Sequence, residues 1–213
     1  MPQVSLEEFV TGVRSGQHLV SFPTDTVPAL ASHPDSAHLI YQAKQRSSDK
    51  PLILMGATLD DLLPYVEGNE SELAVWRQVT DQFWPGPLTL VLPASSLASP
   101  AMNPEQTGTL GIRVPNHPLA RYLLSRTGPL ATTSANRSGE PPLPTVDAIA
   151  AQFPEVLVLS DEAHQQIAQE LESLSAPTGS GMPSTVARWQ GGQWEILRQG
   201  AVQLSPTAGQ PGS

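Results

Sequence analysis

The chain has 213 residues, a formal net charge of -9 and no cysteine. This length is sufficient for one substantial domain. The absence of cysteine excludes disulfides, thiolate metal sites and a cysteine nucleophile. The acidic balance argues against a protein that coats nucleic acid through bulk charge, although it leaves room for a local cationic pocket.

The sequence carries no membrane or export signal that we can identify. No apolar run approaches the roughly 18 to 20 residues needed to span a bilayer. The N-terminal residues lack the basic and apolar regions of a secretory signal peptide. We therefore expect a cytoplasmic protein without membrane association.

Predicted helices and strands alternate along the chain. Capping-box pairs such as Ser5 with Glu8 open several helices, and short apolar runs such as Pro51–Met55 are typical of buried strands. In chain order, the predicted helices begin near residues 5, 36, 58, 69, 117, 145 and 160. The predicted strands cover residues 18–22, 51–55, 84–93 with its proline turn, 110–115, 129–134, 156–159, 184–189, 194–198 and 201–204.

This alternation predicts an α/β fold with a mixed sheet. One domain is expected over residues 1–204, followed by a disordered tail over residues 205–213. In the segment PTDTVPAL, an extended backbone would place Thr24 and Thr26 on one face and Asp25 on the other.

A cationic stretch separates the helix predicted at 36–46 from the strand at 51–55. Lys44, Arg46 and Lys50 supply three of the eleven Lys and Arg residues of the chain within seven positions. Two interpretations stay open from spacing alone. The stretch binds a phosphate or carboxylate, or it is a solvated helix end whose cations complement the helix dipole.

Other polar and cationic residues stand at the ends of predicted strands, where ligands bind in open α/β sheets. Each has an ordinary structural explanation alone, such as turn chemistry, but together they indicate a pocket for anions. They are Thr24, Thr26, Arg46, Lys50, Arg113, Thr132, Ser134, Asn136, Ser184 and Arg198. The sequence lacks the P-loop, Rossmann, H-E-x-x-H and G-x-S-x-G motifs. The five histidines show no ligand spacing, so no protein metal site is predicted.

Seven motifs, in order, resemble those of the YrdC-like threonylcarbamoyl-adenylate synthases. They are PTDTVPAL, AKQRSSDKPL, WPGPLTLVLP, LGIRVPNHPLA, TTSANRSGEPP, PSTVARW and ILRQGAV, which together run from about Val20 to Val202. The resemblance implies a single-domain fold, without a further C-terminal domain, in which a twisted mixed β-sheet with flanking helices surrounds a positively charged concavity.

The resemblance also implies a reaction. L-Threonine, bicarbonate and ATP with Mg²⁺ would give threonylcarbamoyl-AMP and pyrophosphate, and a downstream tRNA threonylcarbamoyltransferase would use the product to modify tRNA. The resemblance also leaves room for direct contact of the protein with tRNA or double-stranded RNA. No protein nucleophile is needed, because the threonine carbamate attacks the α-phosphorus, so catalysis would consist of positioning and charge stabilisation.

Roles carry over position by position from the family motifs. The K-x-R and S-x-N elements imply catalytic roles for Lys44, Arg46, Ser134 and Asn136. Threonine binding is implied for Thr24, Arg113, Thr132 and Ser184. ATP binding is implied for Arg46, Lys50, Thr109, Ser134 and Arg198.

The chain departs from the family pattern at four places. Pro28 and Ala29 stand where Tyr-Gly is usual, Ser47 where proline is usual and Met55 where many relatives have histidine. The segment 160–183 also differs from the usual sequence. Two alternatives therefore stay open. The same concavity could serve a YrdC- or YciO-like protein that binds double-stranded RNA without synthase activity, or a paralogue that only binds a nucleotide.

Overall fold

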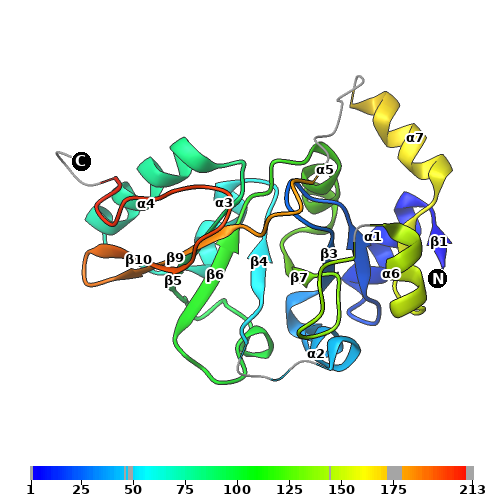
Figure 1. Cartoon of the computed structure of the whole chain (residues 1–213), viewed down its shortest axis with the longest axis horizontal. Helices are drawn as coiled ribbons and strands as arrows, with labels where there is room; N and C mark the ends of the chain where they lie inside the picture. Colours follow the sequence, from blue (N-terminus) through cyan, green and yellow to red (C-terminus); the bar gives the residue numbers. More distant parts are fainter. Residues whose placement is uncertain (1, 46, 48–49, 144, 172–178, 210–213) are drawn as a thin grey trace.

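The computed structural model describes residues 2–45, 47, 50–143, 145–171 and 179–209. Its centre is an eight-stranded mixed sheet in the order β10-β9-β5-β6-β4-β7-β3-β2, flanked by helices (Figure 1). This confirms the predicted α/β class. The strands are β2 (Val20–Phe22), β3 (Ala29–Ser32), β4 (Ile53–Met55), β5 (Leu88–Pro93), β6 (Thr109–Arg113), β7 (Leu130–Ser134), β9 (Thr185–Gln190) and β10 (Gln193–Arg198).

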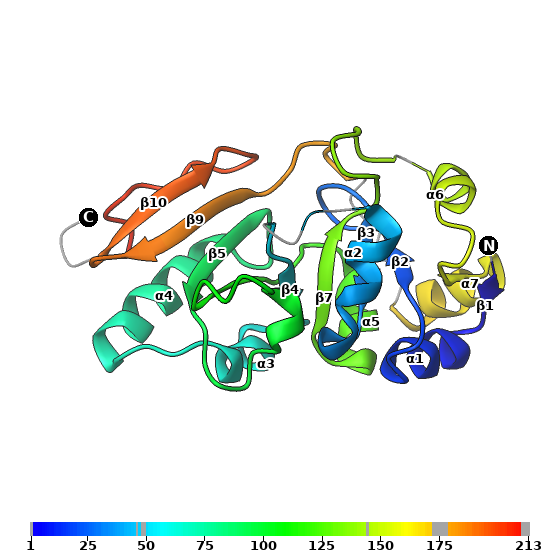
Figure 2. The same cartoon turned by 90° about the horizontal axis from the view of Figure 1, so that it is seen from below.

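The helices cover the sheet unevenly. In Figure 2, α4 lies along β5 and β9, whereas α2 lies beside β3 and β7. The short helix α3 contacts β6. A separate parallel pair joins β1 (Gln3–Val4) to β8 (Val158–Leu159). The helices are α1 (Leu6–Arg14), α2 (His38–Lys44), α3 (Leu59–Leu62), α4 (Glu70–Phe83), α5 (Pro118–Thr127), α6 (Val146–Gln152) and α7 (Asp161–Glu170), with 3₁₀ turns η1 (Pro34–Ser36), η2 (Leu63–Tyr65) and η3 (Pro100–Met102).

The alternation of side chains along β5 explains why one face of the sheet is a core and the other is open. Leu88, Leu90 and Leu92 are buried in a cluster with Trp76 of α4. Because successive side chains point to opposite faces of a strand, Thr89 and Val91 lie on the other face. β5 therefore buries its leucines on the α4 side and presents Thr89 and Val91 on the opposite side.

Capping contacts confirm several of the predicted helix starts, whereas α2 begins at His38 without a side-chain cap. Ser5 with Glu8 forms a reciprocal capping box, and so do Thr58 with Asp61. The same arrangement opens α4 at Asn69 and Glu72. These signals are local in sequence, which is why they are readable before the fold is known.

Three expectations differ from the structure. β1 and β3 were not predicted, because two residues and a run of small residues give a weak periodic signal. The strand predicted at 201–204 is wrong: this segment is bent, and Val202 N–H donates to the hydroxyl of Thr185 at 3.2 Å instead of to a neighbouring strand.

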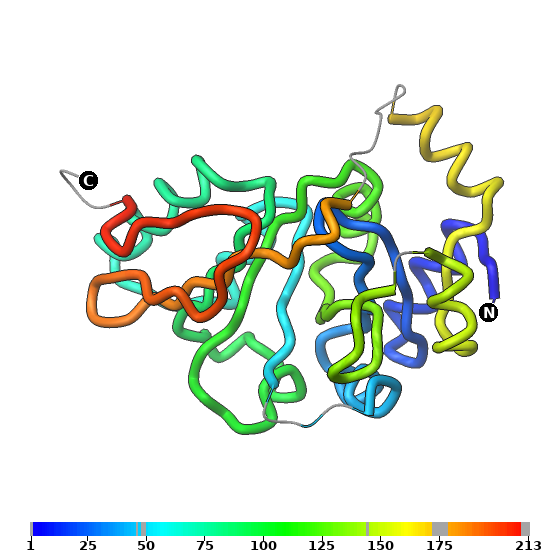
Figure 3. Tube along the Cα trace, viewed as in Figure 1, coloured from blue at the N-terminus to red at the C-terminus, as the bar shows by residue number. Residues whose placement is uncertain are grey.

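The end of the chain is ordered further than the tail predicted at 205–213. Trp194 donates its backbone N–H to Pro206 at 2.9 Å and its indole N–H to the carbonyl oxygen of Ala208 at 3.0 Å. Figure 3 shows this last described segment beside α4, and Gly209 approaches Val75 there. Residues 210–213 lie outside the described residues. Within the part of the chain that the structure describes, no helix is both long and apolar enough to cross a bilayer.

Candidate functional site

A cavity of about 440 Å³ occupies the open face of the sheet. Alternate residues of β4, β5, β6 and β9 form its floor, which follows from the period of two along a strand, and the last three residues of β7 join them. From these strands its lining takes Ile53, Met55, Thr89, Val91, Thr109, Gly111, Arg113, Thr132, Thr133, Ser134, Val186 and Arg188. The walls add residues from the loops, β3 and β10, namely Thr26, Val27, Ala29, Pro51, Leu52, Thr107, Pro142, Pro183, Ser184, Leu197 and Arg198.

The chemistry of this lining differs from that of the chain as a whole. Three arginines and several hydroxyl side chains line the cavity, and none of its lining residues in the described ranges is Asp or Glu. Two of the arginines contact carboxylates beside the cavity, Arg113 with Asp25 and Arg188 with Glu195. The arrangement suits a ligand that carries negative charge.

Arg113 is the most tightly held of the three arginines. Its side chain is 3% exposed, and its Nη2 donates to Asp25 Oδ1 at 2.6 Å. Nη1 donates to Thr26 Oγ1 at 3.0 Å and Nε to the carbonyl oxygen of Gly86 at 3.1 Å. Burial lowers the pKa of Arg113, the charge and hydrogen bond of Asp25 oppose that shift, and the charge of Arg198 adds to it.

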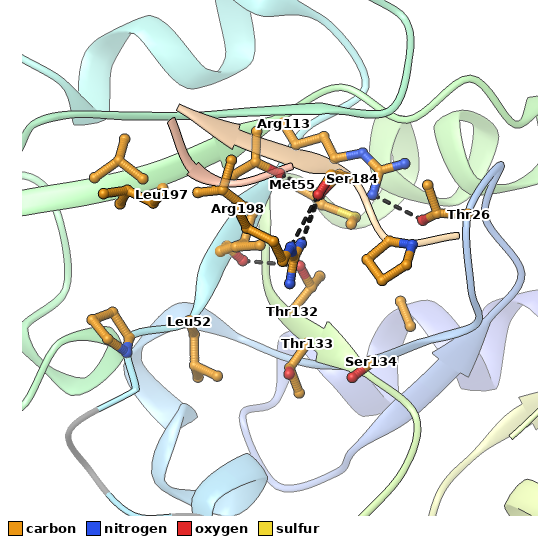
Figure 4. Close-up of a pocket in the computed structure, with 18 of the residues that line it drawn as sticks. Thr26, Leu52, Met55, Arg113, Thr132, Thr133, Ser134, Ser184, Leu197 and Arg198 are labelled. Carbon is orange, nitrogen blue, oxygen red and sulfur yellow. Dashed lines mark hydrogen bonds between the residues drawn. The ribbon is translucent and has the colours of Figure 1, made fainter. Parts of the chain in front are cut away.

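Arg198 and Ser184 form a second cluster in the same cavity. Arg198 donates from Nε and Nη2 to the carbonyl oxygen of Ser184 at 3.1 and 2.9 Å, and Nη2 lies 3.2 Å from its hydroxyl. The hydroxyls of Ser184 and Thr89 lie 2.9 Å apart. Burial lowers the pKa of Arg198. Figure 4 shows Ser184 between the two arginines, with Met55 and Thr132 alongside.

Lys44 lies behind the cavity rather than in its lining. It is 1% exposed, and its ammonium donates to the carbonyl oxygens of Ser134 and Asn136 and lies 3.4 Å from Asn136 Oδ1. The side-chain amide of Asn136 in turn donates to the carbonyl oxygens of Arg137 and Glu140. The end of α2 is thereby fastened to the loop that follows β7.

The structure brings most of the expected site residues together. Those that line the cavity are Thr109, Arg113, Thr132, Ser134, Ser184 and Arg198. Lys44 and Asn136 lie just beneath Ser134, and Lys50 is exposed next to the lining residue Pro51. Arg46 lies outside the described residues.

Thr24 is placed differently from the expectation of direct ligand contact. It is 2% exposed and is absent from the cavity lining, where its neighbour Thr26 appears instead. Its hydroxyl donates to the carbonyl oxygen of Val27 at 2.7 Å and lies 3.0 Å from Thr26 Oγ1. The two hydroxyls do share one side, but the backbone bends between them, so that Thr24 supports Thr26 from behind.

Several lining residues were not among the expected site residues, including Arg188, Thr89 and Gly111. Each alternates with a core residue on a strand that was predicted. A period-two reading of the strands would have identified them, once it was known which face is open.

Across the described ranges, no group of three or more His, Cys, Asp or Glu residues is arranged to hold a metal ion. The lining offers hydroxyl oxygens and arginines rather than carboxylates, so a divalent cation would enter with an anionic ligand that supplies most of its oxygen ligands.

The fold and cavity define a mixed α/β protein with an arginine-bearing ligand site on an open sheet face. The Sua5_yciO_yrdC family, described as telomere recombination, matches residues 13–200. The chain belongs to this family.

Two curated relatives illustrate the similarity. A threonylcarbamoyl-AMP synthase of Chromohalobacter salexigens is 35% identical over 199 residues, covering 91% of this chain and 96% of the relative. A threonylcarbamoyl-AMP synthase of Escherichia coli K12 is 37% identical over 145 residues, covering 66% of this chain and 75% of the relative.

Solved structures share the fold. Sua5 of P. abyssi, solved in complex with L-threonine, superposes with a TM-score of 0.74 at 27% identity, over 93% of this chain and 56% of that one. This chain thus spans little more than half of that Sua5. Escherichia coli YciO superposes with a TM-score of 0.73 at 20% identity, over 95% of this chain and 92% of that one, a likeness of fold.

Proposed function

We propose that the protein is a threonylcarbamoyl-AMP synthase, a nucleotidyltransferase that joins L-threonine, bicarbonate and ATP. The observation that carries this proposal is the convergence of Arg113 and Arg198 on one cavity whose lining in the described residues has no carboxylate. Two anionic groups, a carboxylate and a phosphate chain, can be held together only where cations offset their repulsion. The names of the curated relatives support the same reaction.

The bond changes need no nucleophile from the protein. Bicarbonate takes up a proton and loses water to give carbon dioxide. The threonine amine then adds to the carbon dioxide and releases a proton to form a carbamate, so that the two proton transfers balance. A carbamate oxygen then attacks the α-phosphorus of ATP, the bond from that phosphorus to the bridging oxygen of the β-phosphate breaks, and pyrophosphate leaves. The role of the protein is to align these groups and stabilise the charge that develops.

Arg113 is the proposed partner of the threonine carboxylate. Three of its five N–H groups donate within the protein, which leaves two for a ligand in a planar arrangement that matches a carboxylate. Thr132 and Ser184 line the same part of the cavity. Thr24 acts there indirectly, through Thr26.

The proposed nucleotide contacts are Lys50, Thr109, Ser134 and Arg198, together with Arg46 on the basis of the sequence motif. Arg198 directs its guanidinium toward Thr132 in the cavity. Lys44 and Asn136 hold the loop that carries Ser134. ATP would enter as its Mg²⁺ complex, with the ion held mainly by phosphate oxygens and water.

The wider setting of the reaction is part of the proposal. The product is an activated acyl adenylate, so a tRNA threonylcarbamoyltransferase must consume it, and direct contact with tRNA during hand-over follows as an expectation. We place the protein in the cytoplasm, where these substrates are found. The name of the P. abyssi structure supports L-threonine as the amino acid.

The test is release of pyrophosphate from ATP with threonine and bicarbonate omitted in turn, with mass-spectrometric detection of threonylcarbamoyl-AMP. We expect product only when all three substrates are present, and its loss in Arg46→Ala and Arg198→Met. Arg77→Met is the matched control, because Arg77 is exposed on α4 with only a 4.0 Å contact to Asp60. ATP turnover that ignores threonine, or none at all, would refute the assignment.

The RNA-binding alternative has no observation in its favour among the relatives, which are named as synthases. A gel shift with tRNA at two salt concentrations, run beside the turnover assay, separates the two functions. A protein that only binds a nucleotide would show ATP binding by calorimetry that is independent of threonine.

A further inference from the structure

In the part of the chain that the structure describes, the carboxylate of Asp25 is buried with a hydrogen-bond partner at only one of its two oxygens. Its side chain is 8% exposed, and Oδ1 accepts from Arg113 Nη2 at 2.6 Å. Its other oxygen, Oδ2, is buried and has no hydrogen-bond partner among the described residues. Buried carboxylates that serve only the fold are normally bonded at both oxygens. Among the described residues, Arg113 is therefore the hydrogen-bond partner of the Asp25 carboxylate.

Arg113 is correspondingly fixed in its plane by three acceptors at different places around the guanidinium. Besides Asp25, these are the carbonyl oxygen of Gly86 and the hydroxyl of Thr26. The hydroxyl of Thr24, held by the carbonyl oxygen of Val27, lies against that of Thr26. A guanidinium held this way keeps its plane, so its two remaining N–H groups, one on Nη1 and one on Nη2, have fixed directions.

Asp25 is also held from its backbone. Ser180 N–H donates to the carbonyl oxygen of Asp25, and Gly181 N–H to that of Thr26, both at 3.0 Å. A Cβ at Gly179 would lie 2.7 Å from the carbonyl oxygen of Thr26, so only glycine permits this close approach of two backbones. The segment 179–181 thus clamps the turn that carries Asp25.

We propose that Asp25 is a positioning residue for the amino-acid substrate: it fixes the Arg113 guanidinium in the orientation that receives the substrate carboxylate. Asp25 is absent from the cavity lining, so it acts through Arg113. This inference rests on the proposed function for the identity of the ligand, and on the contacts above for the geometry.

The experiment compares Asp25→Asn with Asp25→Ala. Asparagine keeps an oxygen that can accept from Arg113, whereas alanine removes the acceptor. We expect Asp25→Ala to raise the KM for threonine by about 10- to 100-fold, the range of a hydrogen bond to a charged group. The KM for ATP should change less than about twofold, and Asp25→Asn should recover most of the loss. A role through charge alone predicts equal effects of both variants and overturns the proposal.

A double-mutant cycle tests the route of the effect. If Asp25 acts through Arg113, adding Asp25→Ala to Arg113→Lys changes threonine binding, measured by calorimetry, far less than it does alone. Additive losses overturn the proposal. If Asp25→Ala does not fold, Thr24→Val takes its place, because it removes the hydroxyl behind Thr26. It is then expected to weaken threonine binding and leave ATP binding unchanged, and the opposite result overturns the proposal.

Hydrogen exchange of the Arg113 side chain, measured by NMR without any ligand, tests the positioning role of Asp25 independently of the proposed function. In the wild-type protein the Nε–H of Arg113 is buried and bonded to Gly86, so its NMR signal should exchange slowly with water. In Asp25→Ala the exchange should accelerate at least tenfold, with partial recovery in Asp25→Asn. Unchanged exchange overturns the positioning role even if the enzyme is a synthase. Accelerated exchange in a protein that makes no threonylcarbamoyl-AMP keeps the positioning role and rejects only the substrate.

Discussion

Lys44 and Asn136 are 92 positions apart in the chain, yet the Lys44 ammonium contacts both the backbone and the side-chain oxygen of Asn136. The cation expected to meet substrate is therefore directed at a loop of the protein itself. That loop carries Ser134, which lines the cavity. Through these contacts Lys44 supports the loop that carries Ser134.

Lys44→Met should accordingly cost both stability and activity. Carbonyl oxygens that lose their donor inside a protein cost about 1 to 3 kcal/mol, so we expect the free energy of unfolding in urea to fall by about that amount. Turnover should fall because Ser134 loses its support.

Lys50→Met is the matched control for this change. Lys50 is exposed beside the cavity, and surface substitutions change stability by no more than about 0.5 kcal/mol. It should weaken ATP use while the unfolding curve stays in place. A stable Lys44→Met protein with weak ATP binding would show that Lys44 contacts the ligand directly.

Met55 should set the preference for threonine over serine. It lines the cavity as the direct register partner of Arg113 in the neighbouring strand, so its side chain lies beside the proposed carboxylate site. A methyl contact in an apolar pocket is worth about 10- to 200-fold in kcat/KM. Met55→Ala should reduce the threonine-to-serine ratio by about tenfold or more, mainly through a loss with threonine.

Leu197→Ala provides the comparison for that ratio. Leu197 also lines the cavity but belongs to β10, three strands away from β6 in the sheet. It should leave the threonine-to-serine ratio unchanged, whatever it does to ATP. Equal ratios in wild type and Met55→Ala would remove Met55 from substrate selection.

The sequence predicted those parts of this site that depend on local signals. Capping boxes located helices such as α4, and the strand runs located Arg113 and Thr132 correctly on β6 and β7. The motif resemblance assigned threonine contact to Thr24, whereas Thr26 is the one of these two hydroxyl residues that lines the cavity, because the backbone bend between them depends on distant partners.

The direction of Lys44 was equally hidden from the sequence. The carbonyl oxygens that accept from Lys44 lie about ninety residues away in the chain, and no local sequence pattern predicts a buried ammonium. The role of Asp25 depends on Arg113 in the same way, since the two residues are 88 positions apart. Long-range pairing of the strands brings both Lys44 to its acceptors and Asp25 to Arg113, and a local sequence pattern does not contain this information.

Gly111 should be needed for the cavity but not for the fold. A Cβ there would lie 3.5 Å from Ile53 Cγ1 and 3.6 Å from Thr89 Cγ2, which are ordinary contacts on the cavity floor. We expect Gly111→Ala to unfold at the wild-type urea concentration, because neither contact forces a neighbour to move. Gly111→Val should raise the substrate KM values by about 5- to 100-fold, since overfilling a packed space costs about 1 to 3 kcal/mol. Wild-type kinetics in Gly111→Val would mean that the ligand does not reach the floor.

His117 should make the fold sensitive to mild acid. The residue is 4% exposed, and its Nδ1 accepts from the backbone N–H of Ala120 as the N-cap of α5. Burial lowers the pKa of His117 below its ordinary value, and the charge of Asp25 opposes that shift without reversing it. Below a pH of about 6.5 the unfolded chain therefore takes up a proton that the folded protein resists, and the free energy of unfolding falls as the pH falls.

His117→Asn tests this sign directly, because asparagine keeps a capping oxygen and does not titrate. Urea unfolding between pH 7.5 and 5.5 should show a steeper loss of stability for the wild type than for the variant. One proton limits the difference in slope to about 1.4 kcal/mol per pH unit. The comparison cancels the contributions of the other histidines and of the carboxylates, which both proteins share. Parallel pH profiles would show that His117 is protonated equally in the folded and unfolded states, and that the cap survives protonation.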